Sequence, residues 1–165
     1  MKIIDWVATQ FNQEAKTTRR HLERLPNDKL DWRPHEKSYT AGALASHIVE
    51  CINFTPDIFT KNELNFDPAT YKPYLAASTT ELLEAFDKSV ADGKRVLAAT
   101  DDEAAMQMWS LKFDGKQLFE RPKIDVMRDF TLSHLIHHRG QFSVYLRLLG
   151  VPVPGSYGPT ADEKF

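Results

Sequence analysis

Residues 131–150 read TLSHLIHHRGQFSVYLRLLG and hold three of the chain's six histidines, His134, His137 and His138. Apolar residues recur at helical spacing through this stretch, and it ends in a glycine, which is typical of a helix C-terminus. Residues i and i+4 share one face of an α-helix, whereas successive residues are offset by about 100°. The stretch therefore predicts a helix over about 124–149 that turns His134 and His138 inward, with His137 flanking them or substituting as a ligand.

Three other segments have the same apolar periodicity and predict helices over about 3–24, 41–62 and 79–99. Capping or helix-breaking residues mark their limits, namely Pro26 after the first helix, Thr40 before the second, and Ser78 or Thr79 before the third. Pro56 should kink the second helix or end it early. Four helices of this length favour an all-α four-helix bundle.

Long connectors separate these helices, and residues 1–165 are expected to form a single domain of ordinary size. Residues 100–123 are less regular, and one Asp-Gly turn between apolar stretches predicts a small hairpin or an irregular crossover. Residues 151–165 contain three prolines and predict a non-helical tail. The connectors permit crossovers, so a strict up-down-up-down topology does not follow.

The composition is that of a globular protein with a formal net charge of −2, which gives no support for nucleic-acid binding. Cys51 is the one cysteine, so an intramolecular disulfide is excluded, which suits a reducing compartment. No apolar run approaches the roughly 20 residues of a membrane span, and the N-terminal segment becomes polar too early for a signal peptide. We therefore expect a cytoplasmic protein that acts on small molecules.

The segment 41–62 offers a partner for the histidine pair, because His47 interrupts its apolar stripe and a buried histidine needs a polar partner. Three imidazoles from two helices with a free fourth position are typical of a catalytic divalent-metal site, whereas structural zinc sites are usually closed and rich in cysteine. Taken singly, His47 is more often a satisfied core residue, and pairs such as His134 and His138 also occur by chance on polar faces. Leu135 stands where zinc proteases carry a glutamate, which disfavours a peptidase.

Glu50 and Arg139 are the candidate catalytic residues. Glu50, one turn after His47, is either a fourth ligand or a general base, and a surface glutamate is an equally good interpretation. Arg139 either orients an anionic ligand or pairs with an acid near a helix end. Cys51 is either a soft metal ligand or, as the favoured interpretation, a small buried apolar residue.

For a further group of residues, packing or surface exposure is the favoured interpretation. Glu14 and His21, on the first helix, are expected at a solvated or half-buried edge. If Tyr157 has a functional role, the tail that carries it is expected to fold over the mouth of the site. If Gly140 has one, it allows close helix packing beside the site. The remaining candidates are Gln141, next to the histidine pair, and Trp32 and Trp109, which either line the pocket or cover the end of the bundle.

Three stretches of the sequence resemble the DinB/YfiT-like family of metal-dependent enzymes. LDWRPHEKSYTAGALASHIVE (30–50) is similar to the family's pattern of Trp-x-Pro, an aromatic followed by Ser or Thr, a helix start and an inward histidine. HLIHHRGQFSVYLRLLGVPVP (134–154) is similar to its His-x-x-x-His-Arg-Gly-Gln helix with a Leu/Gly ending. GSYGP (155–159), followed by ADE, resembles the family's tail, so the resemblance covers about the whole chain.

This resemblance implies a four-helix bundle, often dimeric, with a divalent metal, commonly zinc or nickel, on residues that correspond to His47, His134 and His138. Members with assigned activity mostly transfer low-molecular-weight thiols such as bacillithiol or mycothiol to electrophiles, or isomerise maleylpyruvate; others are amide hydrolases. The leading hypothesis is a homodimeric metal-dependent transferase with a low-molecular-weight thiol as cosubstrate and a small electrophile as substrate. The alternatives are a metal-dependent amide-type hydrolase, with Glu50 or a tail residue as base, and a non-catalytic, metal-stabilised ligand-binding protein.

Overall fold

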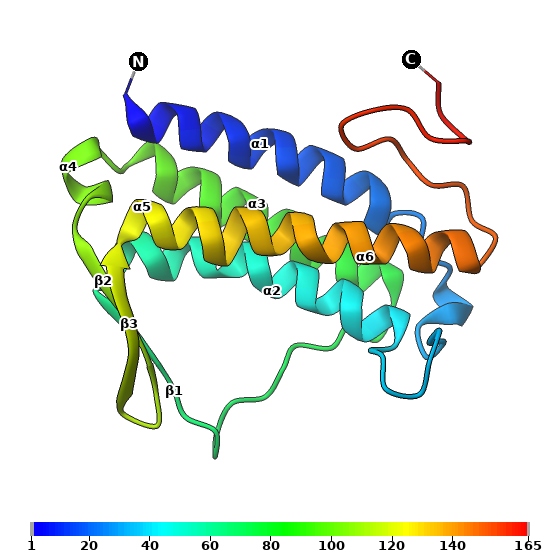
Figure 1. Ribbon diagram of the computed structural model, residues 1–165, viewed down its shortest axis with the longest axis horizontal. Helices are drawn as coiled ribbons and strands as arrows, with labels where there is room; N and C mark the ends of the chain where they lie inside the picture. The colour runs from blue at the N-terminus through cyan, green and yellow to red at the C-terminus, as the bar shows by residue number, and fades with distance from the viewer. Residues whose placement is uncertain (1, 165) are drawn as a thin grey trace.

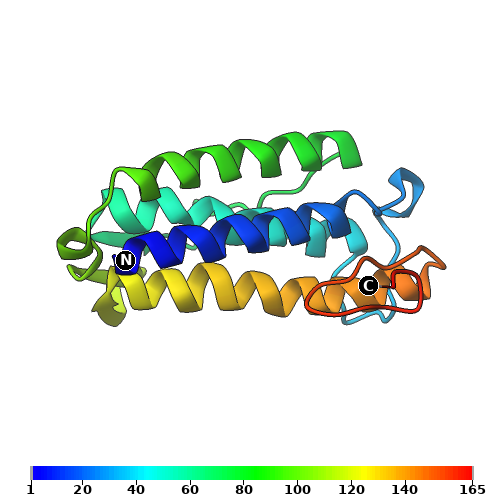
Figure 2. The ribbon, with the colours of Figure 1, turned by 90° about the horizontal axis from the view of Figure 1, so that it is seen from above.

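The computed structural model describes residues 2–164. Within them, four long helical rods lie side by side as a bundle, and a small sheet closes one end (Figures 1 and 2). The rods are α1 (Ile3–Leu22), α2 (Ala41–Thr60), α3 (Thr79–Ala98) and a composite fourth rod of α5 (Lys123–Val126), the π-helix η2 (Met127–Ser133) and α6 (His134–Leu148). Two short helical turns, η1 (Asn27–Lys29) and α4 (Asp102–Ala105), lie in the connectors.

The apolar stripes of the four rods meet in one hydrophobic core, which confirms the predicted helices. Phe11 of α1, Phe86 of α3 and Phe142 of α6 are each 1% exposed or less. α1 and α3 approach closely at Gly93, where a Cβ atom would lie 2.5 Å from Cζ of Phe11, so a glycine is needed there. Among the described helices, none is both long enough and apolar enough to cross a bilayer.

The predicted capping residues of α2 and α3 make the expected hydrogen bonds. The Thr40 hydroxyl accepts one from the Ala43 N–H at 3.1 Å. The Ser78 hydroxyl accepts one from the Glu81 N–H, also at 3.1 Å. Of the two effects expected of Pro56, a kink or an early end of the helix, the early end does not occur, since α2 continues to Thr60.

The all-α prediction is wrong in one respect, because the described residues also form a three-stranded sheet (Figure 1). Its strands are β1 (Glu63–Phe66), β2 (Met108–Phe113) and β3 (Lys116–Pro122). β2 and β3 form a hairpin through Asp114 and Gly115, whose positive φ angles of 50° and 73° suit a tight two-residue turn. β1 pairs in parallel with β2 from within a predicted connector. Its four residues carry little local signal, and the strand depends on pairing with β2.

The fourth rod has an irregularity that the apolar pattern does not reveal. Helix covers 123–148, close to the predicted 124–149, but η2 has the wider i→i+5 hydrogen bonding of a π-helix. The wider turns change the helical phase directly before His134. They therefore help to set the direction in which the histidine pair projects.

The tail, residues 151–164, is non-helical as predicted and lies along α1 and α6 (Figure 2). Arg20 of α1 pairs with Glu163 at 2.5 Å. Arg147 of α6 pairs with Asp162, also at 2.5 Å. These ion pairs hold the tail against α1 and α6.

Candidate metal centre

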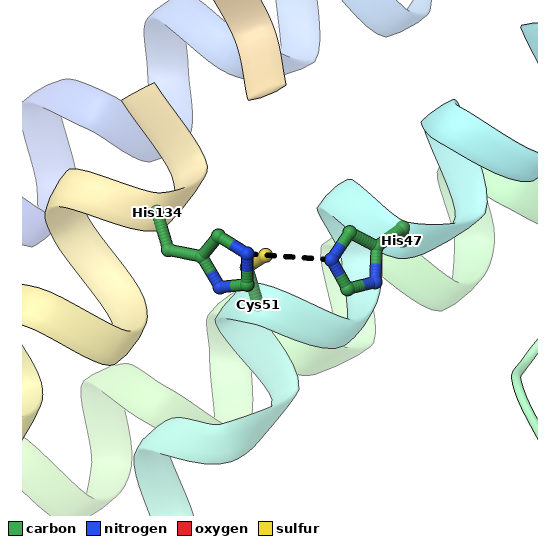
Figure 3. A group of neighbouring side chains, drawn as sticks. All are labelled: His47, Cys51 and His134. Carbon is green, nitrogen blue, oxygen red and sulfur yellow. Dashed lines mark hydrogen bonds between the residues drawn. The ribbon is translucent and has the colours of Figure 1, made fainter. Parts of the chain in front are cut away.

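Three histidines from two helices converge between α2 and α6. His47 projects from α2, whereas His134 and His138 project from α6. The ring centroid of His47 is 5.1 Å from that of His134 and 4.6 Å from that of His138, and the latter two are 4.6 Å apart. Figure 3 shows His47 and His134 facing each other across the gap between the helices. The fold thus brings together the three predicted residues, although His47 lies 87 positions before His134.

Two of the three imidazoles donate a hydrogen bond outward to a protein acceptor. His47 Nδ1 donates to the Glu50 carboxylate at 3.0 Å, and His138 Nδ1 donates to the Gln141 side-chain oxygen at 2.8 Å. In a neutral ring these bonds leave the inner Nε2 of His47 and of His138 unprotonated, with a lone pair that can bind a metal. Such outer acceptors are the usual surroundings of metal-ligating histidines.

The distance between two of the ring nitrogens fits a bound divalent cation. His47 Nε2 lies 3.4 Å from His134 Nε2. Two nitrogens at about 2.0–2.1 Å from one tetrahedral zinc ion are themselves about 3.3–3.4 Å apart. The two nitrogens are within hydrogen-bonding distance of each other, and a cation bound by both would replace that contact. The donor set therefore fits a divalent metal.

His134 and His138 are in the protonation state that metal binding requires. Burial lowers the pKa of His138 to about 4, and the neighbouring imidazoles act in the same direction. Burial also lowers the pKa of His134, again assisted by a nearby imidazole. A neutral imidazole is the ligand form, so a metal has no proton to displace from these two side chains at neutral pH.

Cys51 is a further donor beside the cluster and competes with His138 for the role of third ligand. One ligand atom from each of His47, Cys51 and His134 lies within 4.8 Å of the other two, a group that does not include His138 (Figure 3). Burial, together with the charge of Glu50, raises the pKa of the Cys51 thiol to about 12. Because cysteine binds metals as the thiolate, a metal bound by this group would have to displace the thiol proton.

Glu50 holds His47 in place, and both of its oxygens are engaged. One accepts the His47 hydrogen bond, and the other accepts from the Tyr71 hydroxyl at 3.1 Å and the Tyr74 N–H at 2.8 Å. Burial alone would raise the pKa of Glu50, but these hydrogen bonds outweigh burial and lower it. The arrangement suits a positioning residue better than a free general base. Tyr71 and Tyr74 lie in the connector 67–78, where no periodic signal in the sequence marks them.

Two cavities of similar size flank the histidine cluster. The first, of about 480 Å³, is bounded by β3, η2 and α6 and has His134 and His137 in its wall. The second, of about 460 Å³, is bounded by α2 and the connectors and has His47 and Glu50 in its wall. Both volumes fall in the range of about 300–1,000 Å³ that small-molecule sites occupy. His137 thus flanks the histidine pair and faces the first cavity.

Arg139, the other candidate catalytic residue, is turned away from the cluster toward α1. It is 2% exposed, and its Nη1 donates to the Glu14 carboxylate at 2.6 Å and to the Thr18 hydroxyl at 3.1 Å. The Tyr157 hydroxyl donates to the other Glu14 oxygen at 2.9 Å. Arg139 therefore pairs with an acid in the middle of α1, and Tyr157 closes this contact rather than the mouth of the site.

The expectations for two minor candidates, Glu14 and His21, are wrong, whereas Gly140 is exposed. Glu14 and His21 are 5% and 1% exposed rather than at a solvated edge, because Arg139 and the tail cover them. His21 Nε2 accepts a hydrogen bond from the Ser156 hydroxyl of the tail at 3.4 Å. A Cβ atom at Gly140 would meet no atom within 4 Å, so close helix packing does not require this glycine.

The connector tryptophans cover the ends of the bundle. Trp109 is buried beside Phe119 at the sheet end, with 6.3 Å between the ring centroids. Trp32 packs edge-on against Tyr145 at the opposite end, with 5.7 Å between the centroids. Neither tryptophan belongs to the wall of the two cavities beside the histidines.

A model of the DinB family matches residues 6–164, which is nearly the whole chain. The chain belongs to the DinB family. The uncharacterized protein YrdA of Bacillus subtilis (strain 168) is similar to this DinB chain, with 26% identity over 167 residues. The matched region covers 97% of this chain and 91% of YrdA.

Two crystal structures of DinB-like proteins have the same fold as this DinB chain. A DinB-like protein from Bacillus cereus ATCC 10987 matches with a TM-score of 0.75 and 21% identity, over 94% of this chain and 98% of its own. The DinB-like protein YjoA from Bacillus subtilis matches with a TM-score of 0.72 and 17% identity, over 97% of this chain and 99% of its own. At these identities the likeness establishes the fold, and the chemistry has to be argued from the site.

Proposed function

We propose that this DinB protein is a divalent-metal-dependent transferase that joins a low-molecular-weight thiol to a small electrophile. The observation that carries the proposal is the convergence of His47, His134 and His138, whose ring centroids lie 4.6–5.1 Å apart, with the outer nitrogens of His47 and His138 hydrogen-bonded to the protein. We propose these three residues as ligands of zinc or nickel, with Cys51 as a buried neighbour. The fourth position is left for a reactant.

A divalent ion bound here would lower the pKa of a thiol that reaches it and so supply a thiolate at neutral pH. The protein's own contribution is positional: Glu50 orients His47, and Gln141 orients His138. In the overall reaction the thiol releases its proton to solvent, its sulfur bonds to the electrophilic carbon, and a leaving group departs with its electron pair. No protein cysteine is consumed.

The two cavities support a reaction of two substrates. One cavity has His134 in its wall and the other has His47, so two small molecules have access to the same centre from different sides. A hydrolase needs one organic substrate and water. The second cavity therefore favours group transfer over hydrolysis.

The candidate bases of the hydrolase alternative already have partners. Both oxygens of Glu50 accept hydrogen bonds. The other suggested source of a base, the tail, lies against α1, where Tyr157 and Ser156 contact Glu14 and His21. These contacts favour a positioning role for Glu50 over that of a general base.

The proposal is tested by assaying thiol conjugation with protein that has been stripped of metal and reloaded with zinc or nickel. Cysteine, coenzyme A, glutathione, bacillithiol and mycothiol are offered in turn with monobromobimane as the electrophile. At least one thiol should react faster than the uncatalysed reaction in wild type, and His134→Ala should lose this rate. If none of the thiols reacts faster than the background with the reloaded protein, the proposed transferase is wrong.

A further inference from the structure

We propose that the 480 Å³ cavity between β3 and η2 binds the electrophilic reactant as a planar organic molecule with an anionic substituent, and that Arg121 selects the anion. This inference rests on the proposed function and names the kind of substrate. The cavity is also lined by Phe119, Phe130 and Asp129. None of these residues stood out in the sequence, because β3 and the π-helix bring them together only in the fold.

Aromatic side chains form the inner wall of this cavity. The ring of Phe130 lies 5.9 Å from that of Phe119 and 6.1 Å from that of His134, measured between centroids. Phe119 is backed by the buried Trp109, which holds its ring in place. Flat aromatic or conjugated molecules gain most from packing against such a wall. A molecule seated here also lies against His134, within reach of the proposed metal centre.

Arg121 supplies a cation with spare donors at the rim. Within residues 2–164, its side chain makes one hydrogen bond, from Nη1 to Asp129 at 3.0 Å, and its guanidinium lies 4.8 Å from the centre of the Phe119 ring. Asp129 has a second arginine partner, because Arg128 Nε donates to it at 2.9 Å. A guanidinium has five N–H donors, so Arg121 can bind a carboxylate while Arg128 continues to neutralise Asp129.

The opposite cavity offers an anion a less favourable charge environment. Its wall carries the Glu50 carboxylate and three tyrosines and, among the described residues, no lysine or arginine, whereas the wall of the first cavity carries Arg121 as well as Asp129. An anionic reactant is therefore repelled from the His47 side and attracted to the Arg121 side. His137, exposed on the wall of the first cavity, adds a further N–H donor there.

Calorimetric titration with 2-naphthoate, a planar carboxylate, and 2-naphthamide, its uncharged counterpart, tests this inference. Arg121→Gln should weaken naphthoate binding about tenfold or more and leave naphthamide unchanged, since the loss is that of one charge-assisted contact. Asp129→Asn should strengthen naphthoate binding, because it removes the carboxylate that competes for Arg121. Phe119→Ala should weaken both probes. Tyr39→Phe, in the opposite cavity, should alter neither.

Each titration is run on zinc-loaded and metal-free protein, with the zinc content measured in the same samples. The effect of Arg121→Gln should persist without zinc, because the carboxylate contacts the guanidinium rather than the ion. Equal naphthoate affinity in wild type and Arg121→Gln, or binding to neither probe by wild type, would overturn the inference. A protein that binds naphthoate through Arg121 but takes up no zinc would instead overturn the proposed function, so the two failures are distinguishable.

Discussion

The polar side chains on the two faces of α6 have different surroundings. His138 and Arg139 are neighbours in the sequence, yet one faces α2 and the other faces α1. On the α1 side, the buried Arg139 and Glu14 pair with each other, and the largely exposed Tyr157 donates a further hydrogen bond to Glu14. On the α2 side, Nε2 of His47 and Nε2 of His134 lie 3.4 Å apart beside two cavities.

This difference separates a structural polar cluster from a ligand site. Burying a polar group costs free energy unless a partner compensates for it, and on the α1 side the protein supplies that partner. On the α2 side the outer nitrogens of His47 and His138 have protein partners, whereas the inner Nε2 of His47 faces Nε2 of His134 at 3.4 Å. A bound cation would replace this contact between two ring nitrogens, which is the basis of the metal proposal.

The largest expected effect is on the α1 side. Arg139→Met should reduce the free energy of unfolding by about 3–5 kcal/mol, because it leaves the Glu14 carboxylate buried without its partner. Denaturant unfolding measures this loss. The double variant Glu14→Gln/Arg139→Met should recover much of it. An Arg139→Met protein as stable as wild type would show that the buried pair is not structural.

A smaller effect is expected from Glu50, on the α2 side. Glu50→Gln should weaken metal affinity by about 10- to 100-fold, as is typical when the outer partner of a ligating histidine is altered. Tyr71→Phe, which removes one of the hydrogen bonds to Glu50, serves as the matched control and should change the affinity less. Competition with a chromophoric chelator measures both. Unchanged affinity in Glu50→Gln would contradict the positioning role.

The smallest expected effect is the pH dependence of the contact between the tail and α1. Burial lowers the pKa of His21 below its ordinary value of 6.5; the Thr17 carbonyl opposes this shift, Arg139 and Arg20 add to it, and Glu163 opposes it. The unfolded chain therefore takes up a proton at higher pH than the folded chain, so stability falls as the pH drops below about 6.5.

The variant His21→Gln should show a shallower loss of stability between pH 7 and pH 5 than wild type. Thermal unfolding at a series of pH values compares the two proteins. Parallel curves would mean that His21 titrates alike in the folded and unfolded chains.

Features that are set within one helix were predictable from the sequence. Contacts between segments that lie far apart in the sequence were not. Periodicity and capping at Thr40 and Ser78 predicted the helices, and i,i+4 spacing predicted that His134 and His138 share a face. The strand β1 is stable only beside β2, and the π-helix changes the phase of its rod without a marker in the sequence. For the same reason, Glu14 could not be assigned a partner until α6 and the tail were placed against α1.

The central claim is that three histidines form a metal centre, and elemental analysis tests it most directly. Wild type, His47→Ala, His134→Ala, His138→Ala and Cys51→Ser are purified identically and their bound zinc and nickel are counted. We predict about one ion per chain in wild type and in Cys51→Ser, and a large loss in each histidine variant. Stoichiometric metal in His47→Ala, or no metal in correctly folded wild type after reloading, would contradict the account.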